Sequence, residues 1–349
     1  MPRIIPEGKA KIYAYPGKIS KDLPVFYNPL MKTNRDSSLL VLKALKKKNL
    51  KIALPLAGTG IRGIRFFKEL PKSIIKEIHF NDLSKRAVTD IKKNLKLNQI
   101  KGKFKIKNQE ANLFFVQSEG FDYIDIDPFG SPNLFLGNAL FRLSREGILA
   151  VTATDTAALT GTYPAVCHRK YWAQPLKNEL MHELGLRILI RKIQLLGAQF
   201  DKALLPLLSY AKDHYYRIFF INHKGKELCD ELLKQHLYFL YCPKCLHRET
   251  SKSNQKTCCC TEMLVAGPLW TGPLQDQDFF QKVKTTDPFF QTLKEESKIN
   301  TVGFYDLHQI ASAYKRTISS TQETIQKLKK KCLVAPTHFS FIGFKRPLM

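Results

Sequence analysis

The feature that most constrains the fold is a short apolar segment followed at once by a glycine-rich turn. Residues 51–57 predict a strand, although Pro55 weakens that prediction because proline removes a backbone donor. Residues 58–63 then have the spacing G-x-G-x-x-G, which permits a tight turn and a close approach of the backbone to a ligand. A second predicted strand, 74–80, is followed by Asp82. This order of strand, glycine turn, helix, strand and acid is typical of an open α/β sheet.

The pattern continues along the chain as further strand and helix units. Apolar residues at helical spacing predict a helix over 84–97, and 104–107 predicts a third strand. Successive units of this kind imply a right-handed, mainly parallel sheet with helices on both faces. The remaining elements are a strand at 121–126, a helix at 131–143, a strand at 147–152, a long helix at 176–196 and closing strands at 204–208 and 217–221.

The acidic residues at the strand ends suit an adenosine-containing ligand. Asp82 lies 24 positions beyond Gly58, where a carboxylate can accept both ribose hydroxyls. Glu110, after the third strand, can accept a hydrogen bond from an adenine amine. The alternatives are that Asp82 caps the next helix and that Glu110 is an ordinary loop carboxylate.

The segment Asp127-Pro128-Phe129 is the candidate for chemistry. Pro128 ends the fourth strand, so Asp127 and Phe129 are presented at its carboxyl end, where open α/β sheets bind ligands. The Asp127 carboxylate and the Pro128 carbonyl can accept the hydrogens of an exocyclic amine, and Phe129 can stack on the base. An acidic strand end before a proline turn, without chemistry, is the alternative.

The choice of an acid here favours guanine over adenine. Guanine offers two neighbouring donors, N1–H and N2–H, which one carboxylate can accept together. Adenine pairs its N6 donor with an N1 acceptor, which an amide would suit better. The electrophile that fits is a sulfonium methyl, since it needs neither metal nor acid to leave. A base attacked in this way must be flipped out of any helix.

Upstream, an apolar rhythm predicts a helix that begins after Arg35, with Asp36 or Ser37 as its cap. Arg35 would then lie just before the helix. A solvated arginine on a basic surface is the alternative to a functional role.

Cysteine spacing in the C-terminal part predicts a zinc site. Cys242 and Cys245 form a C-x2-C knuckle, and Cys258-Cys259-Cys260 follow after twelve residues. Adjacent cysteines point in different directions, so Cys258 and Cys260 are the preferred second pair, with Cys259 or His247 as substitutes. Four thiolates leave no open position, so the zinc is expected to be structural. A redox thiol cluster is the alternative.

Charge points to a polyanionic partner. The chain has 56 Lys and Arg against 30 Asp and Glu, a formal net charge of +26. Such an excess repels itself unless counter-charge is present, although a lysine-rich proteome would also explain it. Neither a membrane-spanning run nor a secretory signal is found. We therefore expect a cytoplasmic protein whose cysteines bind metal or stay free thiols and do not form disulfides. No obligate protein partner is inferred.

The C-terminal end predicts a small α+β module. Helices are expected at 304–314 and 318–331, followed by an aromatic, basic strand pair at 338–346. Its charge suits contact with an RNA backbone. For the lysine run 327–331 alone, a solvated helix end is the alternative.

Taken together, these motifs closely resemble the family of tRNA guanine-26 N2-dimethyltransferases. The resemblance implies S-adenosylmethionine contacts at Arg35, Arg65, Asp82, Glu110 and Ala111, a zinc site, and Asp127 as catalytic residue with Phe129 against the base. Glu110 departs from the family, which usually has Asp before Ala-Asn. The residues that carry the likeness are Asn28-Pro29, 34–36, 60–65, Asn81-Asp82, 125–132, 152–156, 267–272 and 305–308.

We therefore expect a two-domain enzyme. Residues 1–224 would form a Rossmann-like, class I methyltransferase domain, and 225–349 a smaller zinc-containing, basic α+β domain that binds tRNA. The enzyme would transfer one and then a second methyl to N2 of guanine 26, with Asp127, Pro128 and Phe129 at the reacting amine. The rivals are a nucleotide-cofactor dehydrogenase, which gives these three residues no role, and a non-catalytic basic RNA-binding protein.

Overall fold

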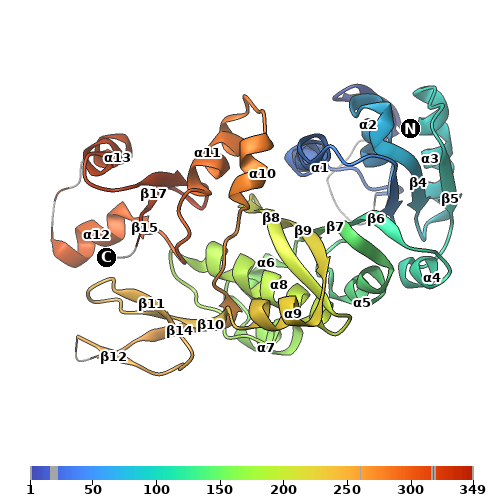
Figure 1. Cartoon of the computed structure of the whole chain (residues 1–349). Helices are drawn as coiled ribbons and strands as arrows, with labels where there is room; N and C mark the ends of the chain where they lie inside the picture. Colours follow the sequence, from blue (N-terminus) through green and yellow to red (C-terminus); the bar gives the residue numbers. More distant parts are fainter. Residues whose placement is uncertain (1, 16–22, 260, 316, 318–319, 348–349) are drawn as a thin grey trace. The chain divides into compact units, whose positions relative to one another are not determined.

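The computed structural model describes residues 2–15, 23–259, 261–315, 317 and 320–347. By packing, the chain divides into two units (Figure 1). The first unit comprises Met1–Ala153 with Phe219–His223, and the second Thr154–Ile218 with Lys224–Met349. The functional boundary expected between residues 224 and 225 stays a prediction.

A parallel sheet forms the centre of the first unit. Strand β3 pairs in parallel with both β4 and β6, so that Ala53 lies opposite His79 on one side and Ile124 on the other. These strands are almost fully buried, as expected for parallel strands covered on both faces. This parallel part of the sheet comprises β3 (Leu50–Leu54), β4 (Ile75–Asn81), β5 (Phe104–Lys107), β6 (Phe121–Ile126) and β7 (Leu143–Ala153).

The complete sheet has seven strands in the order β5-β4-β3-β6-β7-β9-β8, where β8 is Lys202–Lys212 and β9 is Tyr215–Lys224. The order reverses between β3 and β6, which makes that position the topological switch point at which such sheets bind ligands. The α/β class, the open sheet and its predicted strands are confirmed.

The helices of the first unit form two packed groups. Helices α1, α2 and α3 contact one another in sequence, and α4 contacts α5; in Figure 1 α2 lies above the strands and α5 below them. The bounds are α1 (Lys32–Leu45), α2 (Ile61–Glu69), α3 (Lys85–Leu97), α4 (Ala111–Val116) and α5 (Asn133–Arg142).

The predicted start of α1 was wrong. The helix begins at Lys32, not at Asp36, so Arg35 lies inside it. A 3-10 turn over Pro29–Met31 leads directly into α1, and the Asn28 side chain caps that turn by accepting from the Leu30 N–H. Proline fits the first position of a helical turn because its missing N–H would have no partner there.

An N-terminal hairpin brings a carboxylate to these helices. Strands β1 (Arg3–Glu7) and β2 (Ala10–Ala14) are antiparallel and turn at Gly8, whose φ of +55° suits glycine. The backbone N–H groups of Lys11 and Tyr13 donate to Asn98 Oδ1 and Asn94 Oδ1 of the α3 region at 2.9 and 2.8 Å. The hairpin is thereby fixed, and Glu7 lies at its turn.

The second unit is a mixture of helices and small antiparallel sheets. Its two three-stranded sheets have the orders β11-β10-β14 and β15-β17-β16, and β12 and β13 form a separate hairpin. The helices are α6 (Thr156–Leu159), α7 (Pro164–Tyr171), α8 (Met181–Ala198), α9 (Lys226–Leu233), α10 (Gln277–Lys282), α11 (Pro288–Glu296), α12 (Leu307–Tyr314) and α13 (Thr321–Lys329). The other strands are β10 (His236–Tyr241), β11 (Arg248–Ser251), β12 (Thr257–Cys258), β13 (Thr261–Glu262), β14 (Leu264–Trp270), β15 (Tyr305–Asp306), β16 (Ala335–Thr337) and β17 (Ser340–Lys345).

The predicted C-terminal α+β module is present. Helices α12 and α13 match the two predicted helices, although residues 318–319 lie outside the described part. Of the strand pair predicted at 338–346, only β17 lies there, because its partners β16 and β15 come earlier in the chain. Lys345 is buried in an ion-pair network and so does not add to the basic surface of this module, whose contact with RNA stays a prediction. Among the described residues, none of the helices combines the length and apolar character that crossing a membrane requires.

Candidate functional site

The site lies at the carboxyl ends of β3 and β6 in the first unit. Strand β3 ends just before Pro55, and the loop that follows contains Gly58 and Gly60, both with positive φ. Strand β6 ends at Ile126, so Asp127 leaves the sheet at the same edge. Gly130, at a φ of +78°, completes the turn into α5. The predicted turn after Pro128 is therefore present.

Asp127 and Phe129 are accessible from this edge, whereas Pro128 is buried. The Asp127 side chain is 24% exposed and forms an ion pair with Arg62 through Oδ2. The Phe129 ring is 59% exposed and stands nearly perpendicular to Phe26, with 4.3 Å between ring centroids. An acid with one engaged oxygen lies two residues from a solvent-accessible aromatic ring.

Arg62 is the residue that sequence reasoning missed. It is buried on α2, and its guanidinium donates to Asn34 Oδ1 at 2.8 Å and Ser38 Oγ at 2.7 Å, as well as to Asp127. It also lies 3.5 Å from Asp125 Oδ2. Four partners fix the guanidinium, and the guanidinium in turn fixes Asp127. The available signal was its position in the Gly60–Arg65 motif, one helical turn before Arg65.

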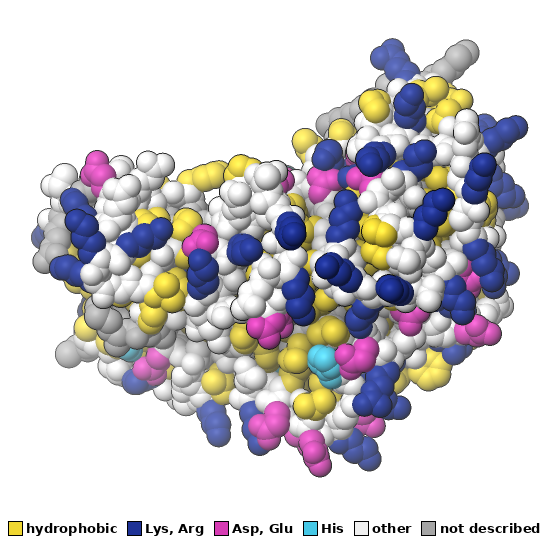
Figure 2. All heavy atoms as spheres, turned by 45° about the horizontal axis from the view of Figure 1, so that its top comes forward, with side chains coloured by type: hydrophobic (Ala, Val, Ile, Leu, Met, Phe, Trp, Pro, Cys, Tyr) yellow, Lys and Arg dark blue, Asp and Glu magenta, His cyan; other side chains and the backbone are white. Residues whose placement is uncertain are grey.

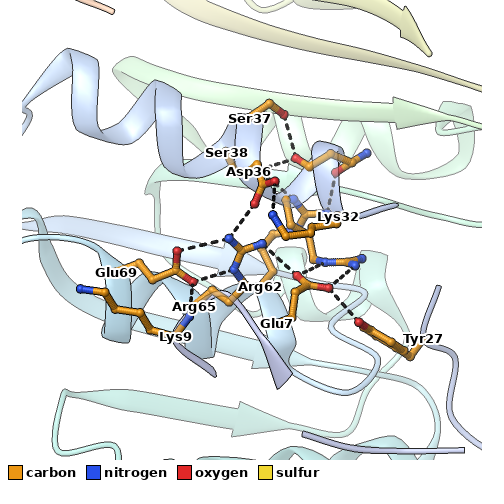
Figure 3. A network of polar contacts seen from close by, with 12 residues as sticks. Glu7, Lys9, Tyr27, Lys32, Asp36, Ser37, Ser38, Arg62, Arg65 and Glu69 are labelled. Carbon is orange, nitrogen blue, oxygen red and sulfur yellow. Dashed lines mark hydrogen bonds and ion pairs between the residues drawn. The ribbon is translucent and has the colours of Figure 1, made fainter. Parts of the chain in front are cut away.

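Arg35 and Arg65 meet at a single carboxylate, Glu7. Figure 3 shows Glu7 between Arg65 and Tyr27. Arg35 donates to both Glu7 oxygens through Nε and Nη2, and Arg65 donates to Oε1 through Nη1 at 2.9 Å. Tyr27 donates to Glu7 Oε2 at 2.9 Å. Burial by itself raises the pKa of Glu7, but the hydrogen bonds and charges of the two arginines outweigh it, so the pKa is lowered.

Arg35 and Arg65 differ in how many carboxylates they contact. Arg65 also binds Asp36 at 2.6 Å and Glu69 at 2.7 Å, so three carboxylates surround it. Arg35 donates to Glu7 through Nε and Nη2, and Nη2 also donates to the Asn28 carbonyl. Its Nη1 has no hydrogen-bond partner within the described part of the chain. Arg35 can therefore receive a further anion without losing an existing contact.

Asp82 is held at the end of β4 by backbone groups. Its Oδ2 accepts from the Gly58 N–H at 2.8 Å and its Oδ1 from the Ser84 N–H at 2.9 Å. Ser84, and not Asp82, caps α3. Burial raises the pKa of Asp82, and the two backbone hydrogen bonds oppose that rise. Each oxygen keeps a lone pair for a ribose hydroxyl, so the geometry fits an adenosine.

Glu110 caps α4, and Ala111 is its first residue. One Glu110 oxygen accepts from the N–H groups of Asn112 and Leu113, and the other accepts from the Asn112 side chain at 3.1 Å. Glu110 is exposed and Ala111 buried. A hydrogen bond from Glu110 to an adenine amine stays a prediction.

A thiol cluster forms in the second unit. The Sγ atoms of Cys242, Cys245, Cys258 and Cys259 all lie within 4.8 Å of one another. Cys242 and Cys258 belong to an apolar cluster with Leu240 and Met263. The His247 N–H hydrogen bond lowers the pKa of the Cys245 thiol to about 7. This all-sulfur donor set fits tetrahedral zinc. Cys260, the predicted fourth ligand, lies outside the described residues.

We expect one zinc ion per chain, released by replacing a cysteine of the cluster. Cys242→Ser should lower the zinc content well below one per chain, because structural zinc needs four ligands. Elemental analysis of purified variants measures this, with Cys332→Ser as the control outside the cluster. Cys259→Ser and Cys260→Ser compared in the same way identify the fourth ligand. Full zinc content in Cys242→Ser would contradict the predicted site.

Basic side chains are frequent on one face of the first unit. In the right-hand part of Figure 2, many Lys and Arg side chains (dark blue) are spread over the surface, with fewer Asp and Glu side chains (magenta) among them. This distribution agrees with the formal charge of +26 and suits a polyanionic ligand.

Comparison with known proteins gives a consistent result over nearly the whole chain. Residues 3–347 match the family model described as N2,N2-dimethylguanosine tRNA methyltransferase. The chain is 41% identical to a tRNA (guanine(26)-N(2)/guanine(27)-N(2))-dimethyltransferase of Aquifex aeolicus, covering 99% of this chain and 93% of the relative. It is 38% identical to a tRNA (guanine(26)-N(2))-dimethyltransferase of Pyrococcus furiosus, covering 97% and 94%.

The structure is also similar to that of Trm1 from Pyrococcus horikoshii in complex with S-adenosyl-L-methionine. The two have a TM-score of 0.86 and 34% sequence identity, and the match covers 99% of this chain and 96% of the other. The expected Rossmann-like, class I methyltransferase sheet is thereby confirmed.

Proposed function

Because this chain belongs to the N2,N2-dimethylguanosine tRNA methyltransferase family, we propose that it methylates N2 of guanine 26 in tRNA, with Asp127 as the residue that activates the amine. S-adenosylmethionine is the methyl donor, and zinc bound by the cysteine cluster is structural. We place the enzyme in the cytoplasm because tRNA is its substrate. The observation that carries the proposed mechanism is the accessible Asp127 carboxylate held by Arg62 at the switch point of the sheet.

On the cofactor side, Asp82 would bind the ribose hydroxyls, and Glu110 and Ala111 would contact the adenine. The free Nη1 of Arg35 would donate to the carboxylate of the methionine moiety. Arg65 belongs to the same group of residues through Glu7, which it holds against Arg35. When bound, the cofactor supplies a methyl group on a positively charged sulfur, which leaves without a metal or an acid.

On the base side, Asp127 would accept N1–H and N2–H of a guanine. Arg62 occupies one side of Oδ2, which leaves the second lone pair of that oxygen and both lone pairs of Oδ1. The Pro128 carbonyl would accept the other N2 hydrogen, and Phe129 would stack on the purine. These acceptors localise the N2 lone pair, which is otherwise delocalised into the ring, and orient it for in-line attack.

The N2 lone pair forms the new N–C bond to the methyl carbon while the C–S bond breaks and its electron pair stays on sulfur. The methylated nitrogen loses one proton, for which the Asp127 carboxylate is the nearest base. One hydrogen remains on N2 after the first transfer, so one of the two N2–H contacts can form again and orient the amine for a second transfer.

Arg35 and Arg65 are expected to respond differently to replacement by lysine. Arg35→Lys keeps a charge beside Glu7 but removes Nη1, so S-adenosylmethionine should bind about tenfold or more weakly, the loss of one charge-assisted hydrogen bond. Arg65→Lys loses fixed contacts to Asp36 and Glu69, so its main effect should be a lower melting temperature. Calorimetric titration with the cofactor and thermal unfolding measure the two effects. Equal loss of cofactor affinity in both variants, with unchanged melting, would refute the distinction.

Methyl incorporation into unmodified tRNA tests the function. Nucleosides from the reacted tRNA should contain N2-methylated and N2,N2-dimethylated guanosine, and mapping should place them at position 26. Mapping must include position 27, because the Aquifex aeolicus relative is named for both positions. A tRNA that is bound but not methylated would favour a non-catalytic RNA-binding protein instead.

A further inference from the structure

An open groove of about 600 Å³ lies within the second unit, away from the residues assigned so far. Four segments line it: the first turn of α8, the end of β8 with the turn that follows, the beginning of α11, and the region where β16 turns into β17. The side chains that matter here are His182, Lys212, Phe289, Phe339 and Phe341. Its volume is within the range of pockets that bind small ligands.

Aromatic rings form much of the groove's surface. Phe341 is fully exposed at the beginning of β17. Phe339, two residues earlier, is stacked on Phe304 with 6.1 Å between centroids and an interplanar angle of 4°. Single exposed apolar residues are common on proteins. Here the exposed ring lies beside fixed rings in a hollow, which is the arrangement that stacks unpaired bases.

The fixed rings are held by buried polar contacts. His338, between them, hydrogen-bonds through Nδ1 to Glu296 and accepts from the Ala211 N–H at 3.2 Å through Nε2. Its ring stands perpendicular to Phe289, with 6.0 Å between centroids. The floor of the groove is therefore rigid, and a ligand would not lose affinity by having to order it.

The polar groups of the groove suit a nucleotide. Lys212 Nζ lies 4.7 Å from the Phe289 ring centroid and has no ion pair among the described residues. The ring nitrogens of His182 have no hydrogen-bond partner in the same described part of the chain. Burial lowers the pKa of His182, so near pH 7 it is neutral and offers one donor and one acceptor. Asp213, at the same turn, is exposed and not paired with Lys212.

We propose that this groove binds an unpaired nucleotide of the tRNA substrate, with the base stacked on Phe341 and the phosphate bound by Lys212. The proposal rests on tRNA being the substrate. Bases in a duplex are already stacked, so exposed rings select single-stranded or loop nucleotides. A free cation beside the rings, in a chain with a net charge of +26, favours RNA over a protein partner.

The test compares tRNA binding by Phe341→Ala and Lys212→Ala with that of the wild type, without cofactor. Phe341→Ala should weaken binding about tenfold and leave the salt dependence unchanged, since stacking involves no ion release. Lys212→Ala should reduce the slope of log affinity against log salt by about 0.7 to 0.9, the value for one phosphate. Phe141→Ala and Lys226→Ala, exposed positions outside the groove, are the matched controls.

Wild-type affinity and salt slope in both groove variants would overturn the proposal. So would equal weakening by Phe341→Ala for a perfect RNA duplex and for tRNA, because a duplex has no unpaired nucleotide to stack. Replacing Phe341 by a photoreactive p-benzoylphenylalanine should crosslink to unpaired tRNA nucleotides and not to stems. Binding is measured without methyl transfer, so a wild type that binds tRNA but methylates nothing would refute the proposed function and leave this test intact.

Discussion

Asp127→Ala is expected to reduce methyl transfer by at least about 10² to 10⁴, the usual contribution of a positioned acid or base. The variant loses the acceptor for N2–H and the nearest base for its proton. tRNA affinity should stay within about threefold of the wild type, because one carboxylate contributes little to binding a polyanion. Single-turnover methyl transfer at saturating tRNA and cofactor, together with tRNA binding, measures the two effects.

The fold should survive this change. Arg62 keeps three of its four partners, Asn34, Ser38 and Asp125, so removing Asp127 leaves no isolated buried charge. Asp127→Asn tests the role more finely, since the amide preserves shape and one acceptor but loses the charge. Glu119→Ala, which removes an exposed carboxylate near the start of β6, controls for the change in net charge. Retained turnover in Asp127→Ala would refute the assigned role.

The sheet could be predicted because its signals are local and repeated. Strand β5 occupies the predicted residues 104–107, and α3 begins after Ser84 as its apolar spacing indicated. Helix α1 was placed too late because the apolar rhythm starts at Leu39, whereas the helix is initiated by the Asn28 cap and Pro29. Helical periodicity marks where a helix packs and does not mark where it begins.

Much of the second unit could not be predicted for a related reason. Helices α9, α10 and α11 are each shorter than ten residues, and β12 and β13 have two residues each. Such short elements contain too little periodicity to be distinguished from loops. They are stabilised by contacts between distant segments, such as the donation of Ser209 N–H to Gln275 at 3.1 Å.

The candidate site likewise contains residues that the sequence indicated and residues that it did not. Asp82 and Asp127 follow strands, so the parallel sheet predicted that they lie at one edge. Glu7 lies 28 residues from Arg35 and 58 from Arg65, and an isolated glutamate in a hairpin carries no sequence signal for that pairing. Arg62 lay in the Gly60–Arg65 motif, but nothing in the sequence indicated its four partners.

We expect the largest effect on stability from a substitution in a second buried network. In the second unit, Lys345 Nζ lies 2.9 Å from Glu183 and 3.5 Å from Glu296, and all three side chains are nearly inaccessible to solvent. Arg187 also binds Glu183 at 2.9 Å, and His338 binds Glu296. Burial alone would raise the pKa of Glu296, but the interactions with His338 and with the Lys345 ammonium lower it to about 2.

Lys345→Met is therefore expected to destabilise the second unit by about 3 to 5 kcal/mol, because it leaves buried carboxylates with too few cations. Glu296 has a lower pKa folded than unfolded, so its stabilisation is complete above its unfolded pKa of about 4.3 and is lost as the pH falls toward about 2. Removing Lys345 raises the folded pKa, so acid unfolding should begin at a higher pH in the variant.

Urea unfolding followed by circular dichroism at several pH values measures both effects, with Lys331→Met in the exposed lysine run as the matched control. The control should stay within about 0.5 kcal/mol of the wild type, as surface substitutions usually do. Since methionine keeps most of the side-chain volume, a large effect would reflect the missing charge and not a cavity. An unchanged unfolding midpoint near neutral pH in Lys345→Met would show that the two carboxylates are neutralised without Lys345, which the short distances between these buried groups argue against.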